Sequence, residues 1–216
     1  MKNAMLAPIS VLTAFCLVAC SAKTAEIENV SQLRYDLLTY EADKFTVVCY
    51  PEIREKNFLS DGIAGEKDLL LGFRFYPTNT VAECVSVSLE ADGGTYTAEF
   101  GEKSGSDYKI CEMQIPTFNK SDLKCMLSVD GELYSVCLSS VKNADTITYI
   151  RAVNGIIETD AERLSAFKKT EPYETRIRLI ENNGYNFWYV GFINSAKTLS
   201  YLIDGATGEI LAVKEN

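Results

Sequence analysis

Residues 123–138 read Leu-Lys-Cys-Met-Leu-Ser-Val-Asp-Gly-Glu-Leu-Tyr-Ser-Val-Cys-Leu. Two runs rich in apolar residues flank Asp130-Gly131, a dipeptide typical of a two-residue hairpin turn. We therefore predict two antiparallel strands, Leu123–Val129 and Glu132–Leu138. In this register residue 125 lies opposite residue 136, so Cys125 and Cys137 point to opposite faces and are poorly placed for a disulfide.

The chain before and after this hairpin carries more short strand-like runs. Regular spacing of such runs is typical of an antiparallel sandwich or an open barrel. A helix is predicted ahead of them over Thr24–Lys44, because apolar residues recur there at three- and four-residue spacing. The further predicted strands are Phe45–Tyr50, Asp68–Tyr76, Val81–Glu90, Thr95–Phe100, Tyr108–Ile115 and Ala144–Val153.

A soft boundary near residue 154 separates this β-rich domain, residues 27–154, from a second module, residues 155–216. We predict a short helix over Asp160–Lys169, ended by Glu171-Pro172. The strands predicted after it are Thr175–Glu181, Phe187–Ile193, Leu199–Asp204 and Glu209–Val213. The predicted class is therefore α+β: an N-terminal helix, an antiparallel sandwich or open barrel, and a small module of a helix and an antiparallel sheet.

The N-terminus has the pattern of a secretory signal. Lys2 is followed by an uncharged, largely apolar stretch that ends in Leu17-Val18-Ala19-Cys20. This ending resembles the lipobox of bacterial lipoproteins. The resemblance implies cleavage between Ala19 and Cys20, acylation of the Cys20 thiol, a tether over residues 20–26, and anchoring to the outer face of a membrane in the cell envelope. An ordinary signal peptide with a chance cysteine, or an uncleaved anchor, remains the alternative.

The net charge, the absence of histidine and the cysteine content exclude several classes of function. The net charge is −9, and loss of residues 1–19 removes one lysine and leaves 20 basic against 30 acidic side chains, a charge of −10. Such a chain is a poor candidate for nucleic-acid binding. It has no histidine, which excludes histidine-dependent catalysis and histidine metal sites. Five cysteines follow Cys20, an odd number without a CxxC motif, and we predict that most are apolar core residues.

The last part of the chain resembles a PepSY-type module over residues 155–214. The resemblance rests on Trp188-Tyr-Val190, on Tyr201-Leu-Ile-Asp204, and on Thr207-Gly-Glu-Ile-Leu211. It implies an extracytoplasmic module that binds or restrains peptidases, with no catalytic residues to transfer.

We predict a non-catalytic protein that binds a protein or peptide, needs no metal or cofactor, and is held to the lipid bilayer through Cys20. Tyr185 and Trp188 are the candidate partner-binding residues, because the strand around them is apolar on both faces; a strand buried on both sides explains the same pattern. Two alternatives stay open. One is a small-ligand carrier with a pocket in the β-domain, and the other is a histidine-free hydrolase that uses paired carboxylates.

Overall fold

The computed structural model describes residues 27–57, 59, 61–78 and 82–216, and this part of the chain forms fourteen strands and two helices. The strands of the first half are β1 (Val30–Arg34), β2 (Leu38–Glu41), β3 (Phe45–Glu55), β4 (Lys67–Pro77), β5 (Val85–Ala91), β6 (Gly94–Glu99), β7 (Gly101–Glu102), β8 (Lys109–Gln114), β9 (Asp122–Val129) and β10 (Glu132–Ser140). The second half holds α1 (Tyr149–Thr159), α2 (Ala161–Lys168), β11 (Glu174–Asn182), β12 (Tyr185–Ile193), β13 (Thr198–Asp204) and β14 (Ile210–Glu215).

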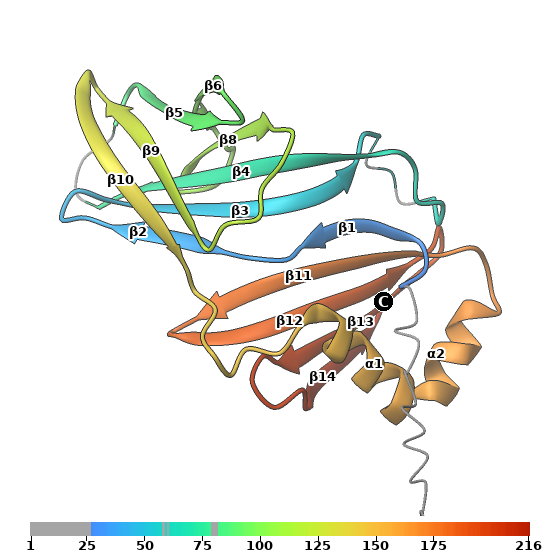
Figure 1. Cartoon of the computed structure of the whole chain (residues 1–216). Coiled ribbons are helices and arrows are strands. Elements are labelled where there is room, and N and C mark those ends of the chain that lie inside the picture. The colour runs from blue at the N-terminus through green and yellow to red at the C-terminus, as the bar shows by residue number, and fades with distance from the viewer. Residues whose placement is uncertain (1–26, 58, 60, 79–81) are drawn as a thin grey trace, which may run out of the picture.

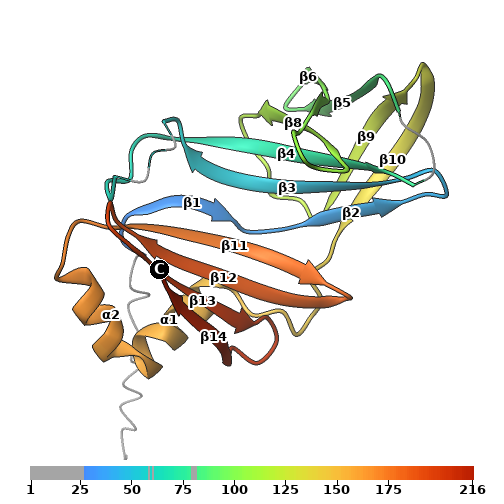
Figure 2. The ribbon, with the colours of Figure 1, turned by 180° about the vertical axis from the view of Figure 1, so that it is seen from behind.

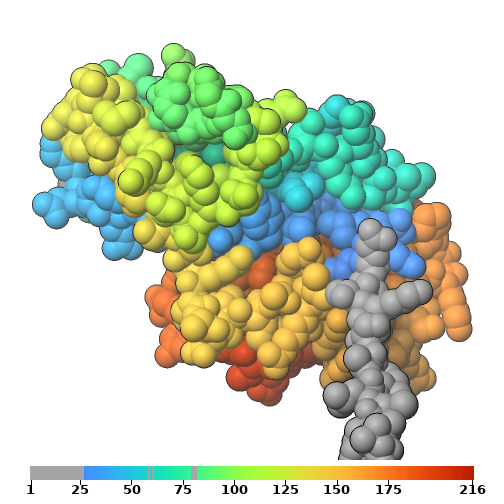
Figure 3. Space-filling model, in the orientation of Figure 1, coloured from blue at the N-terminus to red at the C-terminus, as the bar shows by residue number. Residues whose placement is uncertain are grey.

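All the strands belong to one mixed sheet (Figure 1). Its main path runs β14-β13-β12-β11-β1-β3-β2-β10-β9-β5-β6, and β4, β8 and β7 extend from the other edge of β3. Strand β1 joins the two halves: it pairs antiparallel with β3 and parallel with β11. In the space-filling view, the side chains of the first strands form a blue band between an upper and a lower lobe (Figure 3).

The upper lobe is a curled, barrel-like part of the sheet around the first core. Strands β8, β4, β3, β2, β10, β9, β5 and β6 follow one another around it, and β6 approaches β8. The interior is filled by large side chains that are 0–1% exposed, among them Phe45, Phe73, Phe75, Leu71 and Leu127. Burial of each of these side chains stabilises the folded state by about 1.5–3 kcal/mol. An interior filled in this way has no central channel.

The lower lobe packs both helices against strands β11–β13. Helix α1 begins at Thr148, whose side chain accepts a hydrogen bond from the Arg151 backbone N–H at 3.2 Å. Buried residues of both helices, such as Ile156 and Phe167, share the second core with Ile177 and Tyr201. Neither helix is long and apolar enough to cross a membrane, and no other helix occurs in the described part of the chain.

The predicted helix over Thr24–Lys44 is wrong in its described part, where β1 and β2 lie instead. Its apolar residues contact two different cores: the half-buried Leu33 packs against the second core, and the buried Leu38 lies in the first. The spacing of three and four residues thus arose from a chain that crosses from one lobe to the other. Residues 24–26 lie outside the described residues.

The predicted α+β class is also wrong. The chain is mostly β, with two short helices among the described residues, and the strands form a single mixed sheet rather than separate antiparallel sheets. The predicted strand Ala144–Val153 is replaced by a turn and helix α1. The β-branched residues there resemble a strand, but the cap at Thr148 and the buried face of the helix decide the local structure.

Two local predictions are confirmed. The hairpin of β9 and β10 has the expected register, with Cys125 opposite Val136, and its turn residues Asp130 and Gly131 have φ of 51° and 85°. Cys125 is buried, Cys137 is exposed, and both are free thiols. The short helix and the four last strands also lie close to the predicted ranges. The boundary near residue 154 stays a prediction, although β1 shows that the lobes share a strand.

Candidate functional site

One face of the sheet carries most of the arginines of the chain. Directly opposed residues on neighbouring strands share a face, and Arg34 lies opposite both Glu52 on β3 and Arg178 on β11. Leu33 and Ile177, which alternate with them, point to the second core. Five of the seven arginines in the sequence therefore point away from both cores, and the other two lie on the helices.

We call this surface the arginine face. Strands β4, β3, β1, β11 and β12, which carry most of it, lie side by side in Figure 2. Its residues are Gln32, Arg34, Tyr50, Glu52, Arg54, Arg74, Glu112, Arg176, Arg178 and Tyr189.

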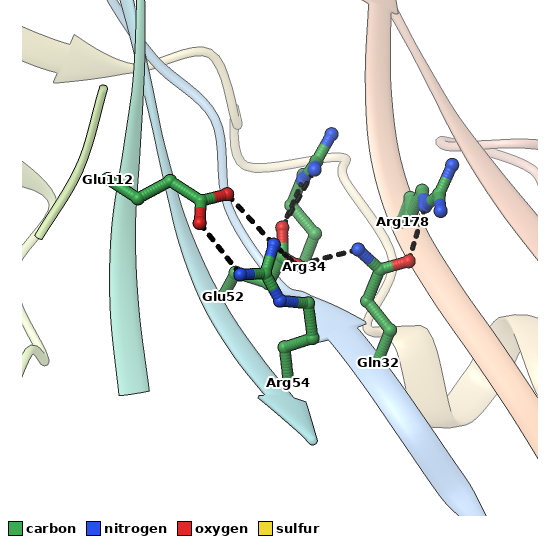
Figure 4. A network of polar contacts seen from close by, with 6 residues as sticks. All are labelled: Gln32, Arg34, Glu52, Arg54, Glu112 and Arg178. Carbon is green, nitrogen blue, oxygen red and sulfur yellow. Dashed lines mark hydrogen bonds and ion pairs between the residues drawn. The ribbon is translucent and has the colours of Figure 1, made fainter. Parts of the chain in front are cut away.

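A polar network holds the centre of the arginine face (Figure 4). The Glu52 carboxylate is 1% exposed and accepts hydrogen bonds from Gln32 Nε2 at 2.6 Å and Arg34 Nη2 at 2.7 Å. Arg54 lies 3.6 Å from the same carboxylate and donates two hydrogen bonds to Glu112, at 2.8 and 2.7 Å. A charge as buried as Glu52 needs such partners, and removal of one costs about 3–5 kcal/mol when nothing replaces it.

Arg74 and Arg178 are not part of any ion pair with a described carboxylate within 4.0 Å. Arg178 Nε instead donates to the neutral Gln32 Oε1 at 2.7 Å. Burial, and then the charge of Arg34, lower the pKa of the Arg178 guanidinium, which still remains protonated at neutral pH. These two arginines thus carry positive charge that no carboxylate of the described residues pairs.

Tyrosine rings lie beside the arginines. The Arg34 guanidinium carbon is 3.7 Å from the centroid of the Tyr50 ring. Arg74 is 5.4 Å from the same ring and 5.3 Å from that of Tyr108, and Arg178 is 5.8 Å from that of Tyr189. Such contacts stabilise a cation by about 0.5–1 kcal/mol at exposed sites.

A glycine lies beneath one of these rings. Tyr50 is paired across the strands with Gly72, and a Cβ at residue 72 would lie only 2.1 Å from Tyr50 Cε2. The missing side chain lets the Tyr50 ring lie flat on the sheet, where Arg34 covers it. The glycine in this strand is explained by that close approach.

The structure separates the two predicted partner-binding residues. Trp188 is 1% exposed and its indole N–H donates to the Ile147 carbonyl at 3.0 Å in the second core. Tyr185 is 69% exposed at the end of the hairpin of β11 and β12. The two side chains lie on opposite faces and do not form one groove. Ala19 and Cys20 lie outside the described residues.

Among the described residues, Glu174 and Glu55 form a buried pair of carboxylates that can be compared with the pair a hydrolase would need. Glu174 is 0% exposed and Glu55 is 4% exposed. Burial raises the pKa of Glu174 although it pairs with Arg176, and the charge of Glu55 adds to the rise. Because both carboxyl groups are shielded from solvent, a substrate has no direct access to them. We interpret this pair as structural.

Sequence reasoning missed the arginine face. The alternation of arginine with apolar residues in Arg176-Ile177-Arg178 and Phe73-Arg74-Phe75 was the available signal. It indicates that arginine lines one side of each strand, but only the register of distant strands brings these sides together.

Comparison with known proteins adds little to this geometry. No family model matches the sequence, and no curated protein matches it. The chain is similar to a crystal structure of a "putative lipoprotein" from Clostridium difficile 630, with 8% sequence identity and a TM-score of 0.27 over 62% of this chain and 83% of that one. The resemblance of residues 155–214 to PepSY-type modules gains no support from these comparisons and stays a prediction.

Proposed function

We propose that this protein is an extracytoplasmic lipoprotein, anchored through an acylated Cys20, that binds an acidic segment of a partner protein without catalysis. The observation that carries the binding proposal is the gathering of five of seven arginines on one sheet face that neither core uses. The anchor is supported by the N-terminal sequence, which ends an apolar stretch with Leu17-Val18-Ala19-Cys20.

The charge of the arginine face favours an anionic partner, although the chain as a whole is acidic. Four carboxylates of the same strands share the face with the five arginines, which leaves a local charge of +1: Glu52, Asp68, Glu112 and Glu174. The charge of the mature chain is −10, but at physiological salt charges separated by more than about 8 Å are largely screened. A short acidic segment on the arginine face therefore experiences mainly the arginines beside it.

The register predicts the spacing of the acidic groups in such a segment. Across the strands, Arg178 is paired with Arg34, Arg34 with Glu52, and Glu52 with Leu70 on β4. Arg178 therefore lies three strands away from Leu70, and Arg74 lies four residues further along β4. With about 4.8 Å between strands and 3.3 Å per residue, the two arginines lie roughly 20 Å apart, or about six residues of extended chain. Two carboxylates about six residues apart would pair with both.

The test is a titration of the mature protein with a twelve-residue peptide whose only charged groups are two aspartates six residues apart, followed by amide chemical shifts. We expect shifts on the arginine face that weaken with salt. Arg74→Gln and Arg178→Gln should each reduce affinity about two- to fivefold, as is typical of exposed ion pairs. Arg151→Gln and Arg163→Gln, on the helices, are matched controls. Equal binding of the same peptide with asparagine for aspartate would refute the proposal.

The anchor has an independent test. Intact mass of the membrane-extracted protein should show loss of residues 1–19 and the added mass of a diacylglyceryl group. Cys20→Ala should lack that mass and leave the membrane fraction. A native chain that keeps its first residues, or carries no lipid, would contradict the anchor and leave the binding proposal to be judged alone.

A further inference from the structure

A pocket of about 340 Å³ lies at the end of the upper lobe, where the β2–β3 and β9–β10 turns meet. The β2–β3 turn is at the far left of Figure 1. Among the residues that line the pocket, Phe45, Phe75 and Ala82 are 1–3% exposed and belong to the first core. The Tyr134 ring meets that of Phe45 edge to face at 5.0 Å. The pocket therefore has an apolar, aromatic floor.

The rim of the pocket is acidic. Asp43, Asp130 and Glu132 line it together with one base, Lys44, which leaves a local charge of −2. Oδ1 of Asp130 is occupied, because it accepts hydrogen bonds from the backbone N–H groups of residues 83 and 84 at 2.9 and 2.8 Å. Asp43 has no ion-pair partner among the described residues.

The rim already holds an ammonium group, that of Lys44. Its Nζ donates to the Glu132 carboxylate at 3.0 Å and to the Tyr134 hydroxyl at 3.2 Å, and it lies 5.8 Å from the centre of the Tyr134 ring. The Lys44 side chain is 65% exposed, and exposed ion pairs of this kind are weak. A second ammonium group could therefore displace it at little cost.

We infer that this pocket binds a small organic cation, an ammonium group joined to an aromatic or short alkyl body. The body would rest on Pro77, Val129 and Tyr134, the half-buried apolar residues of the lining, and the ammonium would take the place of Lys44 beside Glu132, with Asp43 as a second anion. A volume of about 340 Å³ equals roughly eleven water molecules at about 30 Å³ each, which suits a single ring with a short chain. The site is independent of the arginine face.

Three probes with the same body separate charge from apolar contact: phenethylamine, phenethyl alcohol and 3-phenylpropionate. Amide chemical shifts of the mature protein are followed during each titration. We expect shifts at the β2–β3 and β9–β10 turns, with the amine binding more tightly than the alcohol and the carboxylate binding least.

Variants test the assigned roles. Asp43→Asn and Glu132→Gln should weaken amine binding by about twofold or more, whereas Lys44→Met should tighten it, because the resident ammonium is removed. Glu209→Gln, an exposed carboxylate at the other lobe, is the control and should change nothing. The inference is overturned if the alcohol binds as tightly as the amine, if Lys44→Met weakens binding, if the shifts lie elsewhere, or if no probe binds.

Discussion

Replacement of Gly72 by alanine tests the packing beneath the arginine face. Within a strand, alanine normally gives a more stable protein than glycine, because it loses less conformational entropy on folding. This exchange alone would stabilise the protein by about 0.4–1 kcal/mol. Here the new Cβ would lie 2.1, 2.4 and 2.8 Å from three atoms of the Tyr50 ring. The ring cannot simply rise, because the Arg34 guanidinium covers it at 3.7 Å. We therefore expect the opposite sign, a loss of stability.

The magnitude follows from two contributions. Overpacking costs about 1–3 kcal/mol, and loss of the Arg34–Tyr50 contact costs about 0.5–1 kcal/mol. Their sum of about 1.5–4 kcal/mol, less the gain of about 0.4–1 kcal/mol from the exchange alone, leaves a net loss of about 0.5–3.6 kcal/mol. This corresponds to a fall in Tm of roughly 1–14 °C for a chain of this size. Urea unfolding and thermal unfolding, followed by circular dichroism, measure both quantities.

A double-mutant cycle isolates the proposed cause. In a Tyr50→Ala background the ring is absent, so Gly72→Ala should be neutral or stabilising. If Gly72→Ala is as stable as the wild type, or if it destabilises equally with and without the Tyr50 ring, the reasoning is wrong.

Three further predictions concern buried groups. Because burial raises the pKa of Glu174, its folded form binds a proton more tightly than its unfolded form. Stability therefore falls as pH rises from the ordinary pKa of glutamate to the raised pKa, and it levels off above the raised pKa. Glu174→Gln should therefore gain stability relative to the wild type as pH rises above the ordinary glutamate pKa, by about 1.4 kcal/mol for each tenfold difference in proton affinity between the folded and unfolded chain. A stability difference between variant and wild type that is constant with pH in urea unfolding would contradict this. Native alkylation followed by mass spectrometry should modify Cys84 and Cys137, which are exposed, and modification of a buried cysteine at the same rate would count against the core. Trp188 fluorescence should be blue-shifted and poorly quenched by iodide, because the indole is 1% exposed.

Local patterns predicted the hairpins and the last part of the chain correctly. The β9–β10 hairpin depends on the turn at Asp130-Gly131 and on alternation within sixteen residues, and all of this information is contiguous in the chain. The segment 27–44 failed for the opposite reason. Its apolar residues serve two cores, so their spacing reflects the distance between lobes and not the period of a helix.

The candidate site needed information that a single sequence does not contain. Arg34, Arg74 and Arg178 come from β1, β4 and β11, and only the pairing of these strands places them on one face. Trp188 shows the converse. Its strand is apolar on both sides, but the buried indole hydrogen bond to Ile147 reveals a core residue.

The position of β1 has a mechanical consequence for a chain tethered at Cys20. With the proposed anchor, a pull on the tether reaches β1 first, because β1 begins ten residues after Cys20. Strand β1 lies between β3 and β11 in the interior of the sheet. A force along that strand loads the hydrogen bonds on both of its edges in shear, so they must break together rather than one after another. The strand that joins the lobes would therefore also be the point at which the protein bears load from the membrane, and unfolding under tension would begin by the separation of its two halves.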